Sequence, residues 1–403
     1  MTHWVPELLA PAGSLEKLKV AVLYGANAVY LGGQKFGLRT AADNFTYAEL
    51  EEGVEFAHER GCLVYVVLNS FLHDSDLDEL PEFLEYIDKI KVDAVIVSDL
   101  GVIETVKKHS NIEVHLSTQA SCLNSSAALL WKELGVKRVV LGREVSLLEA
   151  KKIKEVSGLE VEMFIHGSMC MAYSGNCVIS NFTQGRDSNR GGCAHSCRFE
   201  YSLDFKNVDN ATEEQKNAYF MSSKDLEGIR VLPEFIDAKI DSLKVEGRMK
   251  SPHYAGTISK VYSSALKYYR ENGSVLSSKI LEWERELRKI THREYTQASL
   301  ITPADESSIY TEREHEQSDY TIAGVVLEVV ADKHLLIEVR SAFEENDDLE
   351  LVPFNGDTIE FKADFLIETD GEKTTRSRPG ILLKVPHVAG AEQWNLLRSR
   401  VSR

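Results

Sequence analysis

Short apolar runs recur along the first part of the chain, separated by segments with the spacing of amphipathic helices. The eight runs read PELLAPAGS, NAVYLGG, CLVYVVLNS, VDAVIVSD, IEVHLSTQ, KRVVLGRE, VEMFIHGS and DSLKVEGR. In the intervening segment YAELEEGVEFAHERG, the residues Leu50, Val54 and Ala57 recur at helical spacing and Gly61 ends the pattern. Strands that alternate with helices indicate βαβ units and a parallel sheet, whose doubly covered strands are apolar throughout.

Eight such units predict an α/β fold, a TIM-like (β/α)8 barrel, although a doubly wound open sheet gives the same alternation. The strand ends favour the barrel. Seven of the eight runs end in polar or glycine residues, among them Ser70, Asp99, Gln119, Arg143, Glu144, His166, Glu246 and Arg248. A single polar residue at a strand end is usually only the start of a loop. Because the carboxyl ends of barrel strands meet on the face that holds the active site, the whole set predicts a functional face.

The pattern changes twice further along the chain. After VEMFIHGS a stretch rich in Gly, Ser, Asn and Arg, over residues 166–200, leads into FEYSLDF and AYFMSSKD, which resemble a hairpin around the connector KNVDNATEEQKN. Beyond YTEREHEQSDY the runs TIAGVVLEVV, HLLIEVR, DDLELVPF, GDTIEFK and GILLKVP are strand-like. We therefore predict a barrel with an inserted cysteine loop over 1–300, a linker over 301–318, and a small C-terminal β-barrel or sandwich over 319–403.

The first residues, MTHWVPELLAPAGS, lack the basic and apolar segments of a secretory signal. No later run approaches the roughly 18 apolar residues of a membrane span. We therefore expect a cytoplasmic protein with no membrane partner. Disulfides are rare in that reducing compartment, and 6 cysteines in 403 residues are too few for a disulfide-stapled scaffold. Metal binding or thiol chemistry is the better explanation for clustered cysteines.

Four cysteines, Cys170, Cys177, Cys193 and Cys197, stand in the inserted loop with the spacing C-x6-C-x15-C-x3-C. Thiolates hold iron-sulfur clusters and are favoured zinc ligands, so a glycine-rich loop of this kind can wrap an ion or a cluster. The spacing has neither the paired C-x2-C knuckles of a zinc ribbon nor the C-x2-C-x2-C run of bacterial ferredoxins. It therefore predicts a metal site without naming the metal.

Charged residues beside these cysteines suggest an anionic ligand. The net charge of -17 argues against a protein that coats nucleic acid non-specifically, but it leaves room for a local basic groove. Arg186, Arg190 and Arg198 interleave with the cysteines, where they could neutralise thiolates, clamp a carboxylate, meet RNA phosphates or only face solvent. His166 or His195 could replace one cysteine as a ligand, or hydrogen-bond near the barrel mouth.

Seven motifs together resemble one known family. They are ELLAPAGS, AVYLGG, LSTQA, FIHGSMCMAYSGNC, GRDSNRGGCAHSCR, SSKDL and LKVEGRMKS, and they are spread over nearly the whole chain. The resemblance is to the collagenase-like peptidase family U32, in particular to its tRNA-hydroxylating branch. It implies a TIM-like barrel whose cysteine loop holds an iron-sulfur cluster of the 4Fe-4S type. It also implies oxygen-independent 5-hydroxylation of the wobble uridine of tRNA, with prephenate as the source of the hydroxyl group.

The resemblance also implies the metal ligands. Cys170, Cys177 and Cys193 match the cluster cysteines of the family. Some relatives take a fourth ligand from further downstream, near SSKDL, where this chain has no cysteine. Cys197 is the nearby substitute, and a cluster with three cysteines and one open iron is the alternative. Zinc remains the other metal that the spacing allows.

A hydroxylase of this kind needs groups for two substrates. The expected substrate-binding residues are Arg143, Arg186, Arg190, Arg248 and Tyr173. The arginines would pair with the two carboxylates of prephenate. Glu144, Glu246 and His166 are the expected catalytic residues, which would orient a donor or move a proton. Tyr173, together with Phe182, would stack on a wobble base splayed from the anticodon, unless these rings only pack the loop onto the barrel.

Two other functions fit part of the pattern. A peptidase would need a nucleophile, and a Cys with a His base is available in CAHSC, but cysteines that bind a cluster cannot also attack a peptide. A non-catalytic metal scaffold is the second alternative. The C-terminal domain could grip the body of the tRNA through the basic stretch KTTRSR, or pack against the barrel or a paralogous partner subunit.

Overall fold

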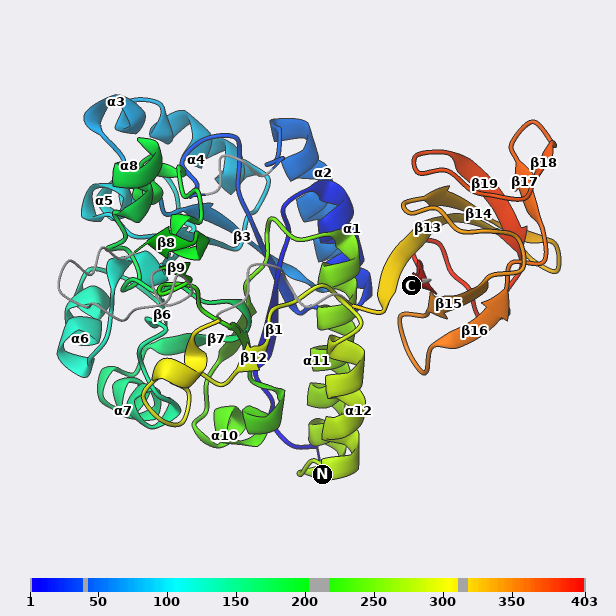
Figure 1. Ribbon diagram of the computed structural model, residues 1–403. Helices are drawn as coiled ribbons and strands as arrows, with labels where there is room; N and C mark the ends of the chain where they lie inside the picture. Colours follow the sequence, from blue (N-terminus) through cyan, green and yellow to red (C-terminus); the bar gives the residue numbers. More distant parts are fainter. Residues whose placement is uncertain (1, 39–42, 203–216, 311–317, 402–403) are drawn as a thin grey trace.

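The computed structural model describes residues 2–38, 43–202, 217–310 and 318–401 (Figure 1). Its first domain is a closed barrel of parallel strands. They are β1 (Glu7–Pro11), β2 (Ala28–Leu31), β3 (Leu63–Leu68), β4 (Ala94–Val97), β5 (Glu113–Leu116), β6 (Arg138–Val140), β7 (Glu160–Ser168) and β11 (Ser242–Val245). The first seven pair in chain order, and β11 pairs in parallel with both β1 and β7. This closure confirms the predicted TIM-like barrel and excludes the open sheet.

Helices cover the outside of the barrel and connect its strands (Figure 1). They are α1 (Leu15–Leu23), α2 (Tyr47–His58), α3 (Asp74–Leu77), α4 (Leu80–Lys89), α5 (Leu100–His109), α6 (Ser125–Glu133), α7 (Leu147–Ser157), α10 (Leu232–Asp237), α11 (Pro252–Asn272) and α12 (Ser277–Leu287). Capping residues set several of the boundaries. In α2, for example, Thr46 and Glu49 form a capping box that satisfies the first backbone N–H groups.

The cysteine insertion follows β7. It contains α8 (Ile179–Gln184), the 3-10 turns Ser188–Arg190 and Ser196–Arg198, and the paired strands β8 (Tyr201–Ser202) and β9 (Asn217–Ala218). Most of the predicted hairpin connector, residues 203–216, lies outside the described residues. The chain then adds β10 (Asp225–Glu227) antiparallel to β7, and β12 (Tyr295–Thr296) parallel to β10. The barrel sheet thus extends beyond the strands expected from the sequence.

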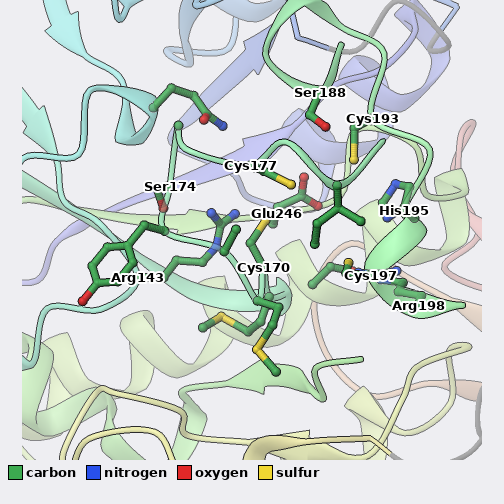
Figure 2. Close-up of a pocket in the computed structure, with 18 of the residues that line it drawn as sticks. Arg143, Cys170, Ser174, Cys177, Ser188, Cys193, His195, Cys197, Arg198 and Glu246 are labelled. Atoms are coloured by element: carbon green, nitrogen blue, oxygen red, sulfur yellow. The ribbon is translucent and has the colours of Figure 1, made fainter. Parts of the chain in front are cut away.

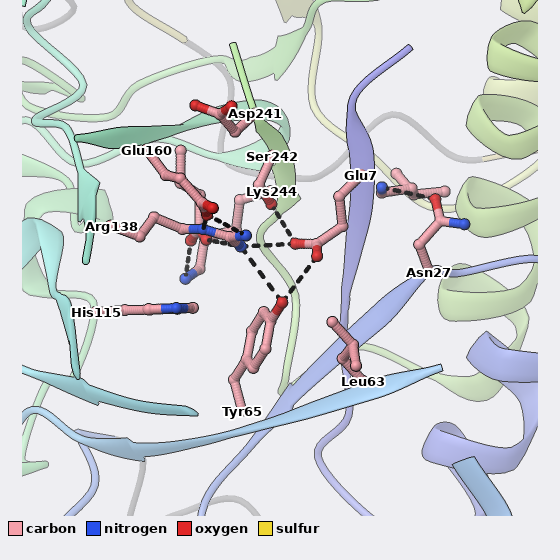
Figure 3. Close-up of polar contacts among 12 residues, drawn as sticks. Glu7, Asn27, Leu63, Tyr65, His115, Arg138, Glu160, Asp241, Ser242 and Lys244 are labelled. Atoms are coloured by element: carbon pink, nitrogen blue, oxygen red, sulfur yellow. Dashed lines mark hydrogen bonds and ion pairs between the residues drawn. The ribbon is translucent and has the colours of Figure 1, made fainter. Parts of the chain in front are cut away.

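Charged side chains fill the N-terminal end of the barrel (Figure 3). Arg138 pairs with Glu7 at 2.7 Å, and Lys244 pairs with the fully buried Glu162 at 2.7 Å. Tyr65 donates a hydrogen bond to Glu7 at 2.8 Å. Burial would raise the pKa of Glu162, but the charges of Lys244 and Arg138 outweigh it and lower that pKa. This ionic layer closes the barrel at the end opposite the carboxyl ends of its strands.

The second domain is a single antiparallel sheet that curls into a half-barrel, and it confirms the prediction of a C-terminal β-domain. Its strands are β13 (Tyr320–Val330), β14 (His334–Val339), β15 (Asp348–Val352), β16 (Ile359–Lys362), β17 (Leu366–Glu368), β18 (Lys373–Thr374), β19 (Leu382–Pro386) and β20 (Leu396–Arg400). Residues 311–317, within the stretch expected to link the domains, lie outside the described residues.

The basic stretch KTTRSR lies at β18 and the turn after it. Arg376 faces Glu344 at 3.8 Å, and Arg378 pairs with Glu368 at 3.0 Å. Acidic partners therefore balance two of its three cations, which reduces the attraction that this stretch could exert on phosphates.

The C-terminal domain packs against the side of the barrel formed by α1, α11 and α12 (Figure 1). Tyr24, the C-cap residue of α1, is buried against Val325, Val352 and Leu396. Arg398, which is fully buried, pairs with Glu350 at 2.7 Å and with Glu286 of α12 at 2.6 Å. Helix α8 of the cysteine insertion lies on the other side of the barrel (Figure 1), so the C-terminal domain stands away from the insertion.

Replacing Tyr24 with Phe is expected to lower the free energy of unfolding by about 2 kcal/mol or more, because two buried backbone groups lose their partner. The Tyr24 hydroxyl donates to the carbonyl of Val352 at 2.6 Å and accepts from the N–H of Leu396 at 2.9 Å. Urea denaturation measures the change. The matched control is Tyr86→Phe, which removes one exposed hydrogen bond to the carbonyl of Tyr47 and should change stability little. Equal losses in the two variants would contradict the role given to Tyr24.

Candidate active site

A cavity of about 240 Å³ lies between the carboxyl ends of the barrel strands and the cysteine insertion. The strand ends contribute Gln119, Arg143 and Glu246 to its wall. The insertion contributes the four predicted cysteines, Cys170, Cys177, Cys193 and Cys197. Figure 2 shows their sulfur atoms around one hollow, with the carboxylate of Glu246 and the guanidinium of Arg143 at its edge. The four thiols, which are at most 27 residues apart in the sequence, thus meet over the face where a barrel enzyme has its active site.

All six cysteines lie in the described ranges and are free thiols. Among the described residues, no three Cys, His, Asp or Glu side chains are close enough together to hold one metal ion. Burial raises the pKa of Cys197 to about 11, so the free thiol is protonated near neutral pH, and binding a metal would release that proton. A single zinc ion requires ligands at about 2.3 Å, whereas a cluster spreads its thiolates around several irons. Four cysteines are also the usual donor set of an iron-sulfur cluster, so the residues present could hold one.

A second, smaller cavity of about 60 Å³ adjoins the first on the barrel axis and shares Gln119, Arg143 and Glu246 with it. We call it the inner chamber. Arg248, which is 4 % exposed, lines it and donates to Oδ1 of Asn44 at 3.1 Å. Two guanidinium groups facing one carboxylate make the inner chamber suitable for a small anionic ligand.

The guanidinium of Arg143 lies over the ring of Phe164 at 3.9 Å. Its Nε atom is buried and has no hydrogen-bond partner among the described residues. A buried donor without an acceptor is costly, so an acceptor from a ligand would stabilise it. Among the residues that line the inner chamber, Arg143 is therefore the best candidate to bind a carboxylate.

Glycines in the sequence motifs make room for these groups. A Cβ at Gly32, in AVYLGG, would lie 2.5 Å from Nη1 of Arg248, and one at Gly13, in ELLAPAGS, would lie 2.0 Å from the carbonyl oxygen of Arg248. A Cβ at Gly175, where φ is +82°, would lie 1.8 Å from the carbonyl oxygen of Gln119. These motifs thus place Arg248 in the inner chamber and let the cysteine insertion approach the strand ends.

Two residues expected to act on substrates instead hold the cysteine insertion in place. Arg190 pairs with Asp76 at 2.9 Å and donates to the carbonyl of Phe71. Glu144 accepts a hydrogen bond from the backbone N–H of Ser174 at 3.3 Å. Neither side chain lines the cavity or the inner chamber. Both fix the insertion over the barrel mouth.

Other predicted residues lie apart from the two cavities. His166 is 1 % exposed and packs among Tyr254, Tyr262 and Tyr295, with Nδ1 at 3.2 Å from the hydroxyl of Tyr262. Burial lowers the pKa of His166 to about 3, so it stays neutral. Arg186 is exposed and lines neither cavity. Phe182 likewise faces solvent, at 87 % exposure.

Tyr173 lines the larger cavity of about 240 Å³, which we call the outer cavity. This side chain is 58 % exposed, as a residue at the rim of the cavity would be. Met171 and Met249 line the same cavity, at 38 % and 48 % exposure. The structure also places Lys250 in this wall, although the sequence argument ended at Arg248. The signal was present in the motif LKVEGRMKS, which continues with a further cation directly after the strand end.

No helix in the described ranges is long and apolar enough to cross a membrane.

Both domains match models of known protein families. Residues 13–309 match the model of "Peptidase family U32", and residues 318–398 match "Peptidase family U32 C-terminal domain". The chain is 42 % identical over 382 residues to "tRNA hydroxylation protein P1" of Bacillus subtilis, covering 93 % of this chain and 89 % of that protein. It is 31 % identical over 415 residues to "tRNA hydroxylation protein P" of Escherichia coli, covering 91 % and 90 %. It is also 32 % identical over 300 residues to "Collagenase" of Porphyromonas gingivalis, covering 71 % of each chain. The chain therefore belongs to peptidase family U32.

Proposed function

We propose that this protein is a tRNA hydroxylase, which adds a hydroxyl group at position 5 of the wobble uridine without oxygen and takes that group from prephenate. The observation that carries the proposal is the convergence of four thiols on a cavity that adjoins a cation-lined chamber on the barrel axis. The two relatives whose names refer to tRNA hydroxylation match at least nine-tenths of this chain, which supports the same substrate.

The cysteine insertion would hold a 4Fe-4S cluster through Cys170, Cys177 and Cys193, with Cys197 as the fourth ligand. Such a cluster supplies electron transfer, and an iron without a protein ligand supplies a Lewis-acid site. Four free thiols around one cavity are the donor set that such a cluster takes. The insertion itself keeps the thiols over the strand ends.

Prephenate would bind with its carboxylates toward Arg143 and Arg248. Charge-assisted pairs of this kind orient a planar carboxylate as well as attract it. Glu246 lines both cavities, so it lies between the co-substrate and the cysteines and is the residue placed to orient a donor or to move a proton. The other expected acid, Glu144, is already engaged with the backbone of Ser174.

The wobble base would enter at the rim of the outer cavity. Modifying a base in a folded RNA requires the base to leave its stack and to be held by flat or adaptable apolar groups. Tyr173 offers a ring, and Met171 and Met249 offer flexible thioethers, at the same rim. These three side chains are the proposed base-binding platform.

The peptidase alternative has less support. A cysteine nucleophile needs a lowered pKa, supplied by a nearby base or positive charge. Burial instead raises the pKa of Cys197 to about 11. His195, the base that CAHSC would supply, lines the same cavity as Cys193 and Cys197, so a peptidase would need the cysteines that the proposal assigns to the cluster.

The proposed reaction is tested with anaerobically purified protein, a tRNA that carries an unmodified wobble uridine, and prephenate. Digestion and mass spectrometry should show a uridine heavier by one oxygen atom, and only when prephenate is present. Extract from cells that lack this protein, added to a second sample, shows whether a paralogous partner subunit is needed. Cleavage of gelatin without any modified uridine, with or without extract, would replace the proposal by the peptidase function.

A further inference from the structure

Three cationic side chains from distant parts of the chain lie near Cys197. Arg198 follows Cys197 in the turn Ser196–Arg198 and lines the outer cavity. Lys250 lies two residues before α11 and lines the same cavity. Arg293 lies two residues before β12 and is 4 % exposed. We call these three residues the cationic group.

Arg198 and Lys250 line the same cavity as Cys197, and electrostatic interactions link Arg293 to both. Burial lowers the pKa of Lys250, and the charge of Arg198 lowers it further, against the opposing effect of Asp225. Burial also lowers the pKa of Arg293, and the charge of Arg198 adds to this, whereas Asp225 and Cys197 raise it. Arg198 is therefore within electrostatic reach of both other cations, and Arg293 is within reach of the thiol of Cys197.

The described residues balance this charge only in part. Among the described residues, the buried Nε atom of Arg198 has no hydrogen-bond partner, and Nζ of Lys250 has neither a hydrogen bond nor an ion pair. This Nζ atom lies 5.5 Å from the ring centre of Tyr254. The carboxylates near Lys250 are Asp225 and Glu246. Asp225 acts on both Lys250 and Arg293, so these two cations share one carboxylate. Positive charge in a partly buried place is costly unless an anion lies beside it.

The motif SSKDL explains how Arg293 reaches this position. The carbonyl of Ser223 accepts a hydrogen bond from Nη1 of Arg293 at 3.3 Å, and Oδ2 of Asp225 accepts one from the backbone N–H of Arg293 at 3.2 Å. Ser223 also donates to the carbonyl of Met169, next to Cys170, at 2.8 Å. One short segment therefore fixes both the start of the cysteine loop and the deepest cation behind Cys197.

We propose that Arg198, Lys250 and Arg293 neutralise the negative charge of the cluster bound by the cysteine insertion and so raise its reduction potential. The inference rests on the proposed function, because it requires the cluster. A cluster ligated by thiolates carries net negative charge, and reduction adds one more electron. Nearby positive charge stabilises the reduced state more than the oxidised one, in proportion to that extra charge.

The test replaces Lys250 with Met, which keeps the length of the side chain and removes its charge. The variant and the wild-type protein are purified without oxygen, and their iron content and the midpoint potential of the cluster are measured by a redox titration followed by absorbance. The variant should keep its iron and show a more negative midpoint potential. Lys250→Arg should restore the wild-type potential.

The matched control is Lys279→Met, which removes the same charge from the surface of α12, where Lys279 pairs with Glu282. It should leave the potential unchanged. Arg198→Met provides an independent variant, because Arg293 is too deeply buried for a simple replacement. Unchanged potentials in Lys250→Met and Arg198→Met that retain their iron would overturn the inference alone. A wild-type protein without iron would overturn the cluster, and the inference with it.

Discussion

Replacing Cys193 with Ala is expected to remove the iron from the protein and to abolish tRNA hydroxylation. Cys193 lines the outer cavity and matches a cluster ligand of the family, so its loss opens the cluster to solvent. Cys170→Ala and Cys177→Ala should have the same effect. Iron and sulfide analysis of anaerobically purified protein, with hydroxylation measured in parallel, checks the result.

Cys122→Ala is the matched control, because Cys122 is buried in the barrel core and lines neither cavity. It should retain both iron and activity. Cys197→Ala separates the two ligand sets: loss of iron identifies a fourth cysteine ligand, and retention identifies three cysteines with one open iron. Full activity in the Cys170, Cys177 and Cys193 variants would contradict the cluster proposal.

Replacing Arg143 with Met is expected to lower kcat/KM for prephenate by about 30-fold, with little change in iron content. The loss of one hydrogen bond to a charged group costs about 2 kcal/mol, and 1.4 kcal/mol corresponds to tenfold. The stem of Met can still pack against Phe164, over which the guanidinium of Arg143 lies. Hydroxylation rates at varied prephenate and fixed tRNA measure the effect.

Arg186→Met is the control for this experiment, because Arg186 is exposed and lines neither cavity. It should leave kcat/KM for prephenate unchanged. If Arg143→Met changed the KM for tRNA and not that for prephenate, Arg143 would bind the RNA, and the assignment of the inner chamber to prephenate would be wrong.

The strands of the barrel were predictable because each is a short apolar run with a polar end, and both features are local. The ionic layer inside the barrel was not. Arg138 and Glu7 pair across 131 positions of sequence, and Glu162 stands inside a run that otherwise reads as apolar. Pairing across a barrel depends on which residues of separate strands face the axis at the same height, and no local pattern carries that information.

The same distinction applies to the site. Gln119, Arg143 and Glu246 reach the cavities because they lie within three residues of the carboxyl ends of parallel strands. His166 does not, because the register of β11 against β7 shifts between Lys244 and Val245, and Val245 pairs with His166. An irregular register breaks the alternation from which side-chain direction is inferred. The ion pair of Arg190 with Asp76 of α3 joins distant segments of the chain, and no local pattern predicts such a contact.

The ionic layer at the N-terminal end of the barrel has a kinetic consequence for the proposed reaction. Lys244 belongs both to that layer and to the wall of the inner chamber, so paired charges form the floor of the chamber. In the proposed reaction, a small molecule bound there would enter and leave by the mouth, which the tRNA would cover. Prephenate would then have to bind before the tRNA, and the product formed from prephenate could leave only after the tRNA. Two substrates that share one entrance would therefore bind in a compulsory order.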